Sequence, residues 1–321
     1  MKYRKLGDTG LEVSEIGFGA WGIGGLTKGA TSYGPTNDDE SRLALETAFD
    51  AGITFYDTSD IYGNGHSEEL LGEVFKNVRS NVIIASKVGF LEPSGRQDFS
   101  PGYIRKSLEA TLRRLQSDYL DLYQLHSPSI EDLDDGEEIK QVLSDLRQEG
   151  KIRAFGVSSR SPSEAINAIS DHEYHSIQVN FNLIDQRAIE VGLFDLSTRE
   201  ESGVIGRTPL CFGFLSGSYQ PGVKFDDRDH RSSWSSKQIE LWANAYHRFS
   251  DVLTNSQGQT PSQNALRFCL SYPAVSTTIP GMMTKAEVLE NAAASELDQL
   301  SQLELGRVRE AYENSVFFAK N

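Results

Sequence analysis

The alternation of short apolar runs with longer helical patterns constrains this chain more than any other feature. The runs are five to eight residues long and mostly continuous, which is typical of strands buried on both faces of a parallel sheet. Eight such strands separated by helices predict a closed parallel α/β fold, the (β/α)₈ TIM barrel. The predicted strands are 14–18, 53–57, 81–87, 119–126, 152–157, 176–180, 203–207 and 276–280.

Both ends of the chain carry segments outside the eight repeating units. Residues 2–14 predict a β-hairpin before the barrel, with its turn at residues 7–10, and residues 300–312 predict an extra C-terminal helix. No proline- or serine-rich linker interrupts the pattern, so we expect one barrel domain over residues 1–321. Three serine positions indicate helix starts: Ser67, Ser100 before Pro101, and Ser161 before Pro162.

Composition excludes several kinds of partner. A formal charge of −15 argues against nucleic acid and anionic membranes, which require clustered basic residues, and the acidic run 131–138 is expected to be a solvated loop and helix start. Cys211 and Cys269 lack metal-ligand spacing, so a reducing compartment fits. With no apolar leader at the N-terminus and no 18-residue apolar stretch, we expect a cytoplasmic protein without a membrane span.

Gly17, Gly19 and Gly22 have the G-x-G-x-x-G spacing of a dinucleotide-binding loop. That loop opens a helix directly, but here further glycines follow as far as Gly34, and the first good helix cap is Asn37 or Asp38. We therefore expect a strand end followed by a long glycine-rich loop.

Polar residues end three consecutive predicted strands. Asp57, Lys87 and His126 stand at these ends, and Tyr62 follows Asp57 in its loop. Active sites of such barrels lie at the carboxyl ends of the strands. Each residue alone has a structural interpretation, as a cap, a packed loop aromatic or a hydrogen-bonded rim histidine, but a lysine that ends an apolar strand needs an anionic partner.

Together these residues form a proton-donating device. A phenol donates poorly near neutral pH, and the Lys87 ammonium would help Tyr62 by stabilising the phenolate. Asp57 would hold Lys87 in place, and His126 would donate a hydrogen bond to a carbonyl oxygen. No side chain supplies hydride, so a nicotinamide is expected at the same rim.

The motifs in this chain resemble those of the aldo-keto reductases. They are FYDTSDIYGNGHSEELLG, ASK, LHSP, GVS and IPG, in this order, and the resemblance covers nearly the whole chain. It implies a barrel that binds NADPH in extended form without a Rossmann motif. The residues that it places along the cofactor are Gly19, Trp21, Asp57, Ser158, Gln178, Arg207, Thr208, Leu210, Leu215, Gly217, Gly281, Lys285, Glu287, Glu290 and Asn291.

The resemblance also implies roles along this groove. Ser158 and Gln178 would bind the nicotinamide carboxamide, although Ser159 stands where the family usually has asparagine. Arg207 would lie on the nicotinamide face, where the family commonly has tyrosine. The alternative interpretation is that Arg207 forms an ion pair at the end of its strand. The pyrophosphate would meet the segment after strand seven, and adenine would meet the helix after strand eight.

The stretch IPGMMTKAEVLEN departs from the family pattern for binding a 2′-phosphate. Lys285 is its only cation, and Glu287 stands where arginine or glutamine is usual. Amides at the helix start and Thr284 would still hold a phosphate, but a carboxylate there accepts a hydrogen bond from a free ribose hydroxyl. We expect NADPH to be used, with weak discrimination against NADH.

The predicted function is reversible reduction of an aldehyde, aldose or keto sugar, with Tyr62 as general acid and base. Two alternatives stay open: a cofactor-binding regulatory subunit with little turnover, and a non-redox barrel isomerase or lyase. His172 and His175 lack a nearby third ligand, so a surface segment is preferred over a metal site. The sequence leaves the carbonyl substrate and the oligomeric state open, and the loop 28–35 is one place where the pocket would vary.

Overall fold

The computed structural model describes residues 1–27, 32–92, 95–172, 174–253 and 258–319; residues 28–31 of the predicted pocket loop lie outside them. Its centre is an eight-stranded sheet, ordered β3 to β10, in which all neighbouring strands are parallel. The predicted barrel is thereby confirmed. The strands are β3 (Phe18–Gly19), β4 (Phe55–Asp57), β5 (Ile83–Val88), β6 (Leu120–His126), β7 (Ile152–Ser158), β8 (Ser176–Asn180), β9 (Gly203–Arg207) and β10 (Val275–Ile279).

The barrel closes between the segment around β3 and the end of β10. Parallel bridges join Ile16 to Thr278 and Gly19 to Gly281. Gly19 permits this approach, because a Cβ there would lie 2.9 Å from the Ile279 carbonyl oxygen. The first strand is shorter than predicted, since residue 14 belongs to the hairpin and only residues 18–19 form the strand.

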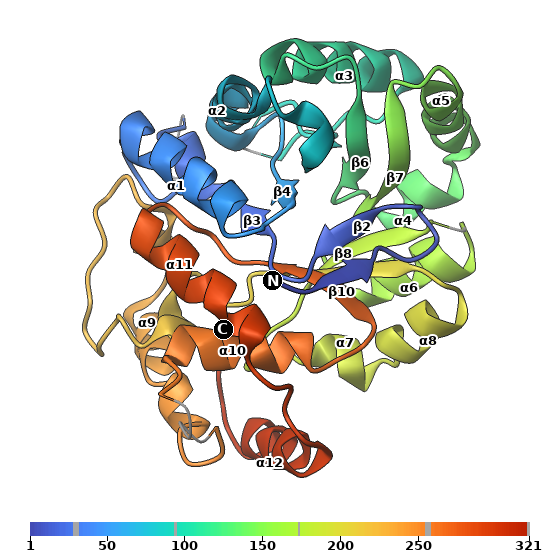
Figure 1. The fold of residues 1–321 in the computed structure, drawn as a ribbon. Coiled ribbons are helices and arrows are strands. Elements are labelled where there is room, and N and C mark those ends of the chain that lie inside the picture. Colours follow the sequence, from blue (N-terminus) through green and yellow to red (C-terminus); the bar gives the residue numbers. More distant parts are fainter. Residues whose placement is uncertain (28–31, 93–94, 173, 254–257, 320–321) are drawn as a thin grey trace.

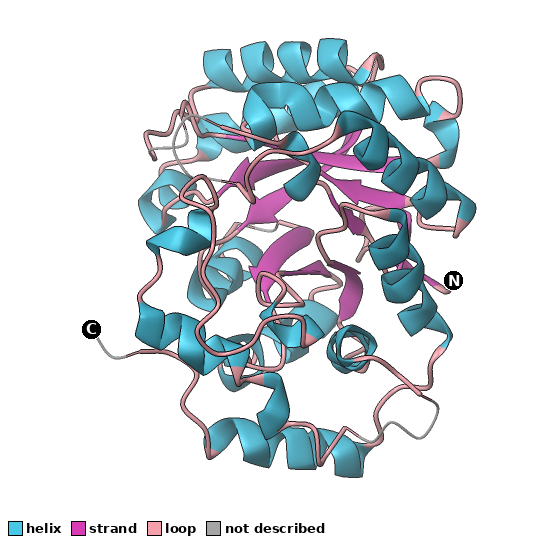
Figure 2. Cartoon of the chain, turned by 90° about the vertical axis from the view of Figure 1, so that its left-hand side faces the viewer, coloured by secondary structure: helices cyan, strands magenta, loops and turns pink. Residues whose placement is uncertain are grey.

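Helices surround the strands (Figures 1 and 2). Their bounds are α1 (Asp38–Asp50), α2 (His66–Phe75), α3 (Pro101–Leu115), α4 (Ile130–Asp134), α5 (Glu137–Gln148), α6 (Pro162–Ser170), α7 (Arg187–Glu190), α8 (Leu193–Arg199), α9 (Ser236–Ala243), α10 (Pro261–Leu270), α11 (Lys285–Ala293) and α12 (Gln302–Glu313). The last of them is the predicted C-terminal helix. No helix in these described ranges is long and apolar enough to cross a membrane.

The structure tests the three predicted helix starts. Ser100 and Ser161 cap α3 and α6, each followed by proline. The prediction for Ser67 was wrong, because α2 begins at His66 after Gly65. The buried Ser67 hydroxyl instead donates to the Ala20 carbonyl at 2.8 Å. The first part of the acidic run forms α4 rather than a loop, whereas its last two residues begin α5, as the predicted helix start requires.

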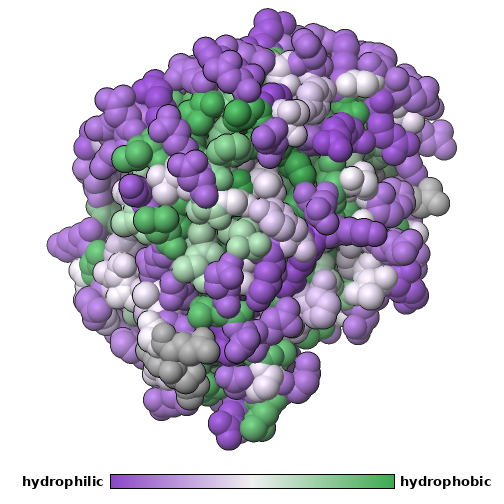
Figure 3. All heavy atoms as spheres, in the orientation of Figure 1, coloured by the Kyte–Doolittle hydropathy of each residue, from purple (hydrophilic) through white to green (hydrophobic). Residues whose placement is uncertain are grey.

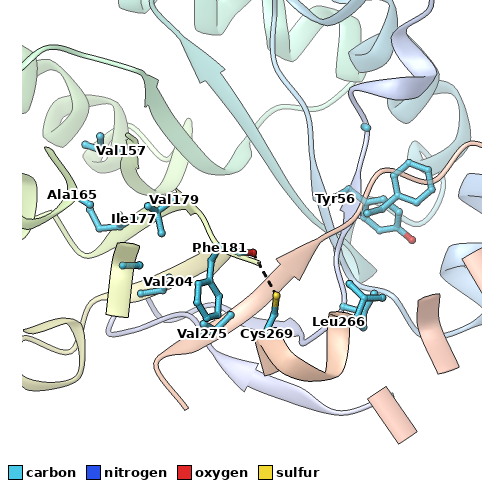
Figure 4. Packing of buried hydrophobic residues seen from close by; sticks show 14 of the residues in the cluster. Tyr56, Val157, Ala165, Ile177, Val179, Phe181, Val204, Leu266, Cys269 and Val275 are labelled. Carbon is cyan, nitrogen blue, oxygen red and sulfur yellow. Dashed lines mark hydrogen bonds between the residues drawn. The ribbon is translucent and has the colours of Figure 1, made fainter. Parts of the chain in front are cut away.

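Two apolar layers hold the barrel. Outside, strand residues such as Val157, Ile177 and Val204 are buried under the helices, and the Cys269 thiol of α10 donates to the Phe181 carbonyl at 3.4 Å (Figure 4). Both cysteines are free and buried. Inside lies a smaller cluster that joins the strands to the hairpin: Phe55, Ala85, Leu122, Ala154, Ile205 and Ile279 with Leu6, Leu11 and Val13.

The predicted hairpin, β1 (Tyr3–Lys5) with β2 (Glu12–Ser14), therefore seals the N-terminal end of the barrel, across which it lies in Figure 1. Around it, hydrophilic residues form most of the rim of this face, with smaller apolar patches nearer its centre (Figure 3). Because the hairpin packs against this end, we look for a ligand site at the carboxyl ends of the strands.

Candidate active site

The four predicted catalytic residues meet at the open end of the barrel. Asp57 ends β4, Lys87 is the penultimate residue of β5, and His126 ends β6. Tyr62 begins the 3-10 turn Tyr62–Gly65 that follows β4. Gly63 in this turn has φ of 61°, and a Cβ there would lie 2.1 Å from the Gly24 carbonyl oxygen. Glycine is thus required for the Tyr62 turn to pack against the first βα loop.

The Lys87 ammonium directs its hydrogen bonds at three acceptors. Nζ donates to Asp57 Oδ1 at 2.5 Å, to the Thr58 carbonyl at 2.8 Å and to Tyr62 Oη at 3.1 Å. An ammonium has three hydrogens, so this set satisfies it completely. Since the Tyr62 oxygen accepts from Lys87, the phenol hydrogen is available to another acceptor.

Electrostatics keep Lys87 charged although its side chain is fully buried. Burial by itself would lower the pKa of Lys87, but Asp57 and Tyr62 outweigh it and raise that pKa above its ordinary value. The site therefore holds a permanent positive charge beneath the Tyr62 hydroxyl.

Two buried amides hold the other oxygen of Asp57. Gln178 Nε2 donates to Asp57 Oδ2 at 2.7 Å and Gln124 Nε2 donates to it at 3.2 Å. Sequence reasoning missed Gln124, although a signal existed: it lies two residues before His126 on one strand, and residues two apart in a strand share a face. Asp57 is thus fixed from three directions and orients Lys87.

His126 is a neutral imidazole at the wall of the site. Burial, followed by the nearby charges of Lys87, Arg207 and Arg160, lowers the pKa of His126 well below its ordinary value. Its ring lies edge-on to Tyr62 with centroids 6.2 Å apart, so the two side chains face the same space.

A cavity of about 550 Å³ opens above these residues. The predicted residues that line it are Gly19, Trp21, Asp57, Tyr62, His126, Gln178, Arg207, Thr208, Leu210, Gly281, Glu287, Glu290 and Asn291. The predicted residues that lie off its wall are Lys87, Ser158, Leu215, Gly217 and Lys285. The cavity thus extends from Tyr62 past the ends of β8 and β9 to α11.

The predicted carboxamide pair is bonded internally. The buried Ser158 hydroxyl donates to Gln178 Oε1 at 3.1 Å, and only Gln178 reaches the cavity. Ser158 therefore positions Gln178 in this structure.

The ion-pair alternative for Arg207 is not found among the described residues. Its Nη2 donates to the Ser159 carbonyl at 2.9 Å, while its Nε is buried without a hydrogen-bond partner. Burial lowers the pKa of Arg207 from its usual value, although the nearby Tyr62 and Asp57 act to raise it. Arg207 is thus a buried cation on the cavity wall that has no carboxylate partner among the described residues.

The structure corrects the view that the amides before α11 are available to a phosphate. Glu287 completes a capping box with Thr284, and its carboxylate accepts from the Met283 and Thr284 amides at 2.8 and 3.0 Å. These donors are engaged by a charge of the same sign as phosphate.

Aromatic residues form the outer wall. Trp21 packs on Tyr33 at 5.0 Å, and Arg231, paired with Asp229, lies over the Tyr33 ring at 4.6 Å. Arg231 lies in the loop that precedes α9, and it lines the cavity. The two histidines considered as ligands lie apart, His172 beside Asp134 and His175 beside Asp8.

Comparison with known proteins identifies the family of the chain. The Aldo/keto reductase family model matches residues 15–313. Aldo-keto reductase YhdN of Bacillus subtilis (strain 168) is 32% identical over 289 residues, covering 88% of this chain and 85% of the relative. The holo form of aldo-keto reductase AKR11C1 from Bacillus halodurans is 28% identical with a TM-score of 0.80, covering 98% of both chains. Glycerol dehydrogenase AKR11B4 from Gluconobacter oxydans is 27% identical with a TM-score of 0.82, covering 99% of this chain and 97% of that one.

The barrel fold and these comparisons place the chain among the NAD(P)H-dependent oxidoreductases that act on small carbonyl compounds. The chain belongs to the aldo-keto reductase family.

Proposed function

We propose that this protein reduces an aldehyde, aldose or keto sugar reversibly, with Tyr62 as general acid in reduction and general base in oxidation. One observation carries the proposal: Lys87 Nζ donates to Tyr62 Oη from a fully satisfied, buried position. The phenol hydrogen then points to a carbonyl oxygen in the cavity. As Tyr62 gives up this hydrogen, the adjacent ammonium stabilises the developing phenolate.

The remaining residues orient the reactants. Asp57 holds the Lys87 ammonium beside Tyr62. The neutral His126 donates a hydrogen bond to the same carbonyl oxygen as Tyr62. Two donors on one oxygen polarise the carbonyl and fix its plane. The nicotinamide, when bound, supplies the hydride.

Residues of this chain would hold the cofactor along the cavity. Gln178 and Arg207 lie beside the catalytic residues, and Glu290 and Asn291 of α11 line the far end. Ring-stacking walls at Trp21 and Tyr33 favour a cyclic substrate. The relative named glycerol dehydrogenase supports interconversion of alcohols and carbonyls.

The direct test is NADPH oxidation with 4-nitrobenzaldehyde, methylglyoxal and a panel of aldoses and keto sugars. Steady turnover supports the enzyme. Tight NADPH binding without turnover on any substrate favours the regulatory subunit, and absence of cofactor binding in a fluorescence titration favours a non-redox barrel.

His126→Ala is expected to lower kcat/KM for carbonyl reduction by about 10²-fold, because it removes one donor to the reacting oxygen. The NADPH Kd, measured by fluorescence titration, should change less than about threefold. His126→Asn, which retains a donor, should recover part of the loss. An equal loss of NADPH affinity would make His126 a cofactor-binding residue instead.

Glu287→Gln is expected to strengthen NADPH binding relative to NADH by about tenfold, since glutamine preserves the capping box while the charge near the 2′ position disappears. Glu287→Arg should shift the preference in the same direction by ~1 kcal/mol or more, but it also loses the cap. Kd values for both cofactors check this, with Glu310→Gln on α12, away from the cavity, as the control. A wild-type preference for NADPH above about 10³-fold, or ~4 kcal/mol, would contradict this role for Glu287.

A further inference from the structure

A serine hydroxyl connects His126 to a second acidic residue that the proposed mechanism does not use. Ser59 Oγ lies 3.3 Å from His126 Nδ1 and 3.1 Å from Asp60 Oδ1. On its other side Asp60 Oδ2 accepts from the Ser107 hydroxyl of α3 at 2.9 Å. Asp60, Ser59 and His126 thus form a continuous chain from the interior to the cavity wall.

The hydroxyl of Ser59 has one hydrogen, so two arrangements allow Ser59 to donate to one neighbour while it accepts from the other. If Asp60 is ionised, Ser59 donates to it and must accept from His126 Nδ1–H, which leaves Nε2 without hydrogen. If Asp60 is protonated on Oδ1, it donates to Ser59, Ser59 donates to Nδ1, and the hydrogen of the neutral imidazole lies on Nε2. Only the second arrangement gives His126 a donor away from Ser59 and towards a carbonyl in the cavity.

We propose that Asp60 and Ser59 are positioning residues that select the tautomer of His126, so that carbonyl reduction is supported while Asp60 carries a proton. This inference rests on the proposed role of His126 as a donor to the substrate. The two arrangements differ by one proton: Asp60 passes its proton to Ser59, the Ser59 hydrogen passes to Nδ1, and the Nε2 proton leaves to solvent.

The surroundings of Asp60 bring its pKa close to neutral pH, so that both forms are populated there. Burial, together with the charge of Glu68 on α2, raises the pKa of Asp60 to about 7. Hydrogen bonds from Ser107 and Ser59 and the charge of Arg114 on α3 act in the opposite direction. Arg114 is paired with Glu68 at 2.6 Å. Because its charge is largely balanced by Glu68, Arg114 lowers the pKa of Asp60 only partly.

The other groups near this chain do not replace Asp60 in this role. Tyr103 and Tyr123 face Asp60 from α3 and β6, and burial raises the pKa of both phenols, so they stay neutral. Around His126, the cations Lys87, Arg207 and Arg160 disfavour the imidazolium. The imidazole of His126 therefore carries a single N–H hydrogen. The hydrogen bond with Ser59 decides which of its two nitrogens holds that hydrogen.

The kinetic test is the pH profile of kcat/KM for NADPH-dependent reduction between pH 5.5 and 9. Wild type should lose about tenfold per pH unit above a midpoint near 7. Asp60→Asn should hold its low-pH rate to pH 9: Ser107 donates to the amide oxygen, so the amide NH₂ faces Ser59 and keeps hydrogen on Nε2. Ser107→Ala, which removes a donor to the carboxylate, should move the midpoint up by about half a pH unit.

A measurement without substrate or cofactor separates this proposal from the proposed function. Ring ¹⁵N shifts of the full-length protein report each histidine tautomer, and His126→Gln assigns the His126 signal among the six histidines. Wild type should change from Nε2–H at pH 6 to Nδ1–H at pH 8.5, and Asp60→Asn should stay Nε2–H. One tautomer throughout in wild type, or an unchanged switch in Asp60→Asn, overturns the proposal, whether or not the protein turns over NADPH.

Discussion

Tyr62→Phe is expected to lower the turnover number for carbonyl reduction by at least about 10²-fold, because it removes the proton donor and leaves the ring in place. The Lys87 ammonium loses one of its three acceptors in this variant but keeps Asp57 and the Thr58 carbonyl. The NADPH Kd should therefore stay within about threefold of wild type. Stopped-flow NADPH oxidation and a fluorescence titration measure the two quantities separately.

Tyr33→Phe is the matched control, since Tyr33 lies on the wall of the same cavity. Its turnover should remain within a few-fold of wild type. Unchanged turnover in Tyr62→Phe, or an equal loss in both variants, would remove Tyr62 from its proposed role.

Lys87→Met is expected to have a second large effect, on both activity and stability. Turnover should fall at least about 10²-fold, because nothing then stabilises the phenolate of Tyr62. Removing one partner of a buried ion pair costs about 3 kcal/mol or more of unfolding free energy. We expect the lower end of that range, because Asp57 keeps the amides of Gln124 and Gln178.

Urea unfolding monitored by circular dichroism, beside single-turnover kinetics, tests the Lys87 prediction. The double variant Asp57→Asn/Lys87→Met removes both charges and should recover much of the stability but none of the activity. An unfolding free energy of Lys87→Met equal to that of wild type would contradict the prediction. It would mean that water hydrates the Asp57 carboxylate in place of Lys87.

Much of the fold followed from local sequence patterns. Continuous apolar runs predicted the strands to within a few residues, since both faces of a barrel strand are buried whatever the loops do. The strand-end positions of Asp57, Lys87 and His126 followed from the same patterns, because parallel strands bring their carboxyl ends to one rim. Ser67 misled the helix assignment, since a serine satisfied by a distant carbonyl looks the same in sequence as one that caps a helix.

The sequence by itself determined the barrel, the end of it that carries chemistry and the four residue types at the rim. Only the tertiary structure decided how their protons are arranged: that Lys87 is fully satisfied by three acceptors, that Glu287 occupies the amides before α11, and that Ser59 connects Asp60 to His126. The physical reason is the range of the interactions. Burial of an apolar strand is encoded in a few consecutive residues, whereas a hydrogen bond depends on about 3 Å between atoms that residues far apart in the chain bring together.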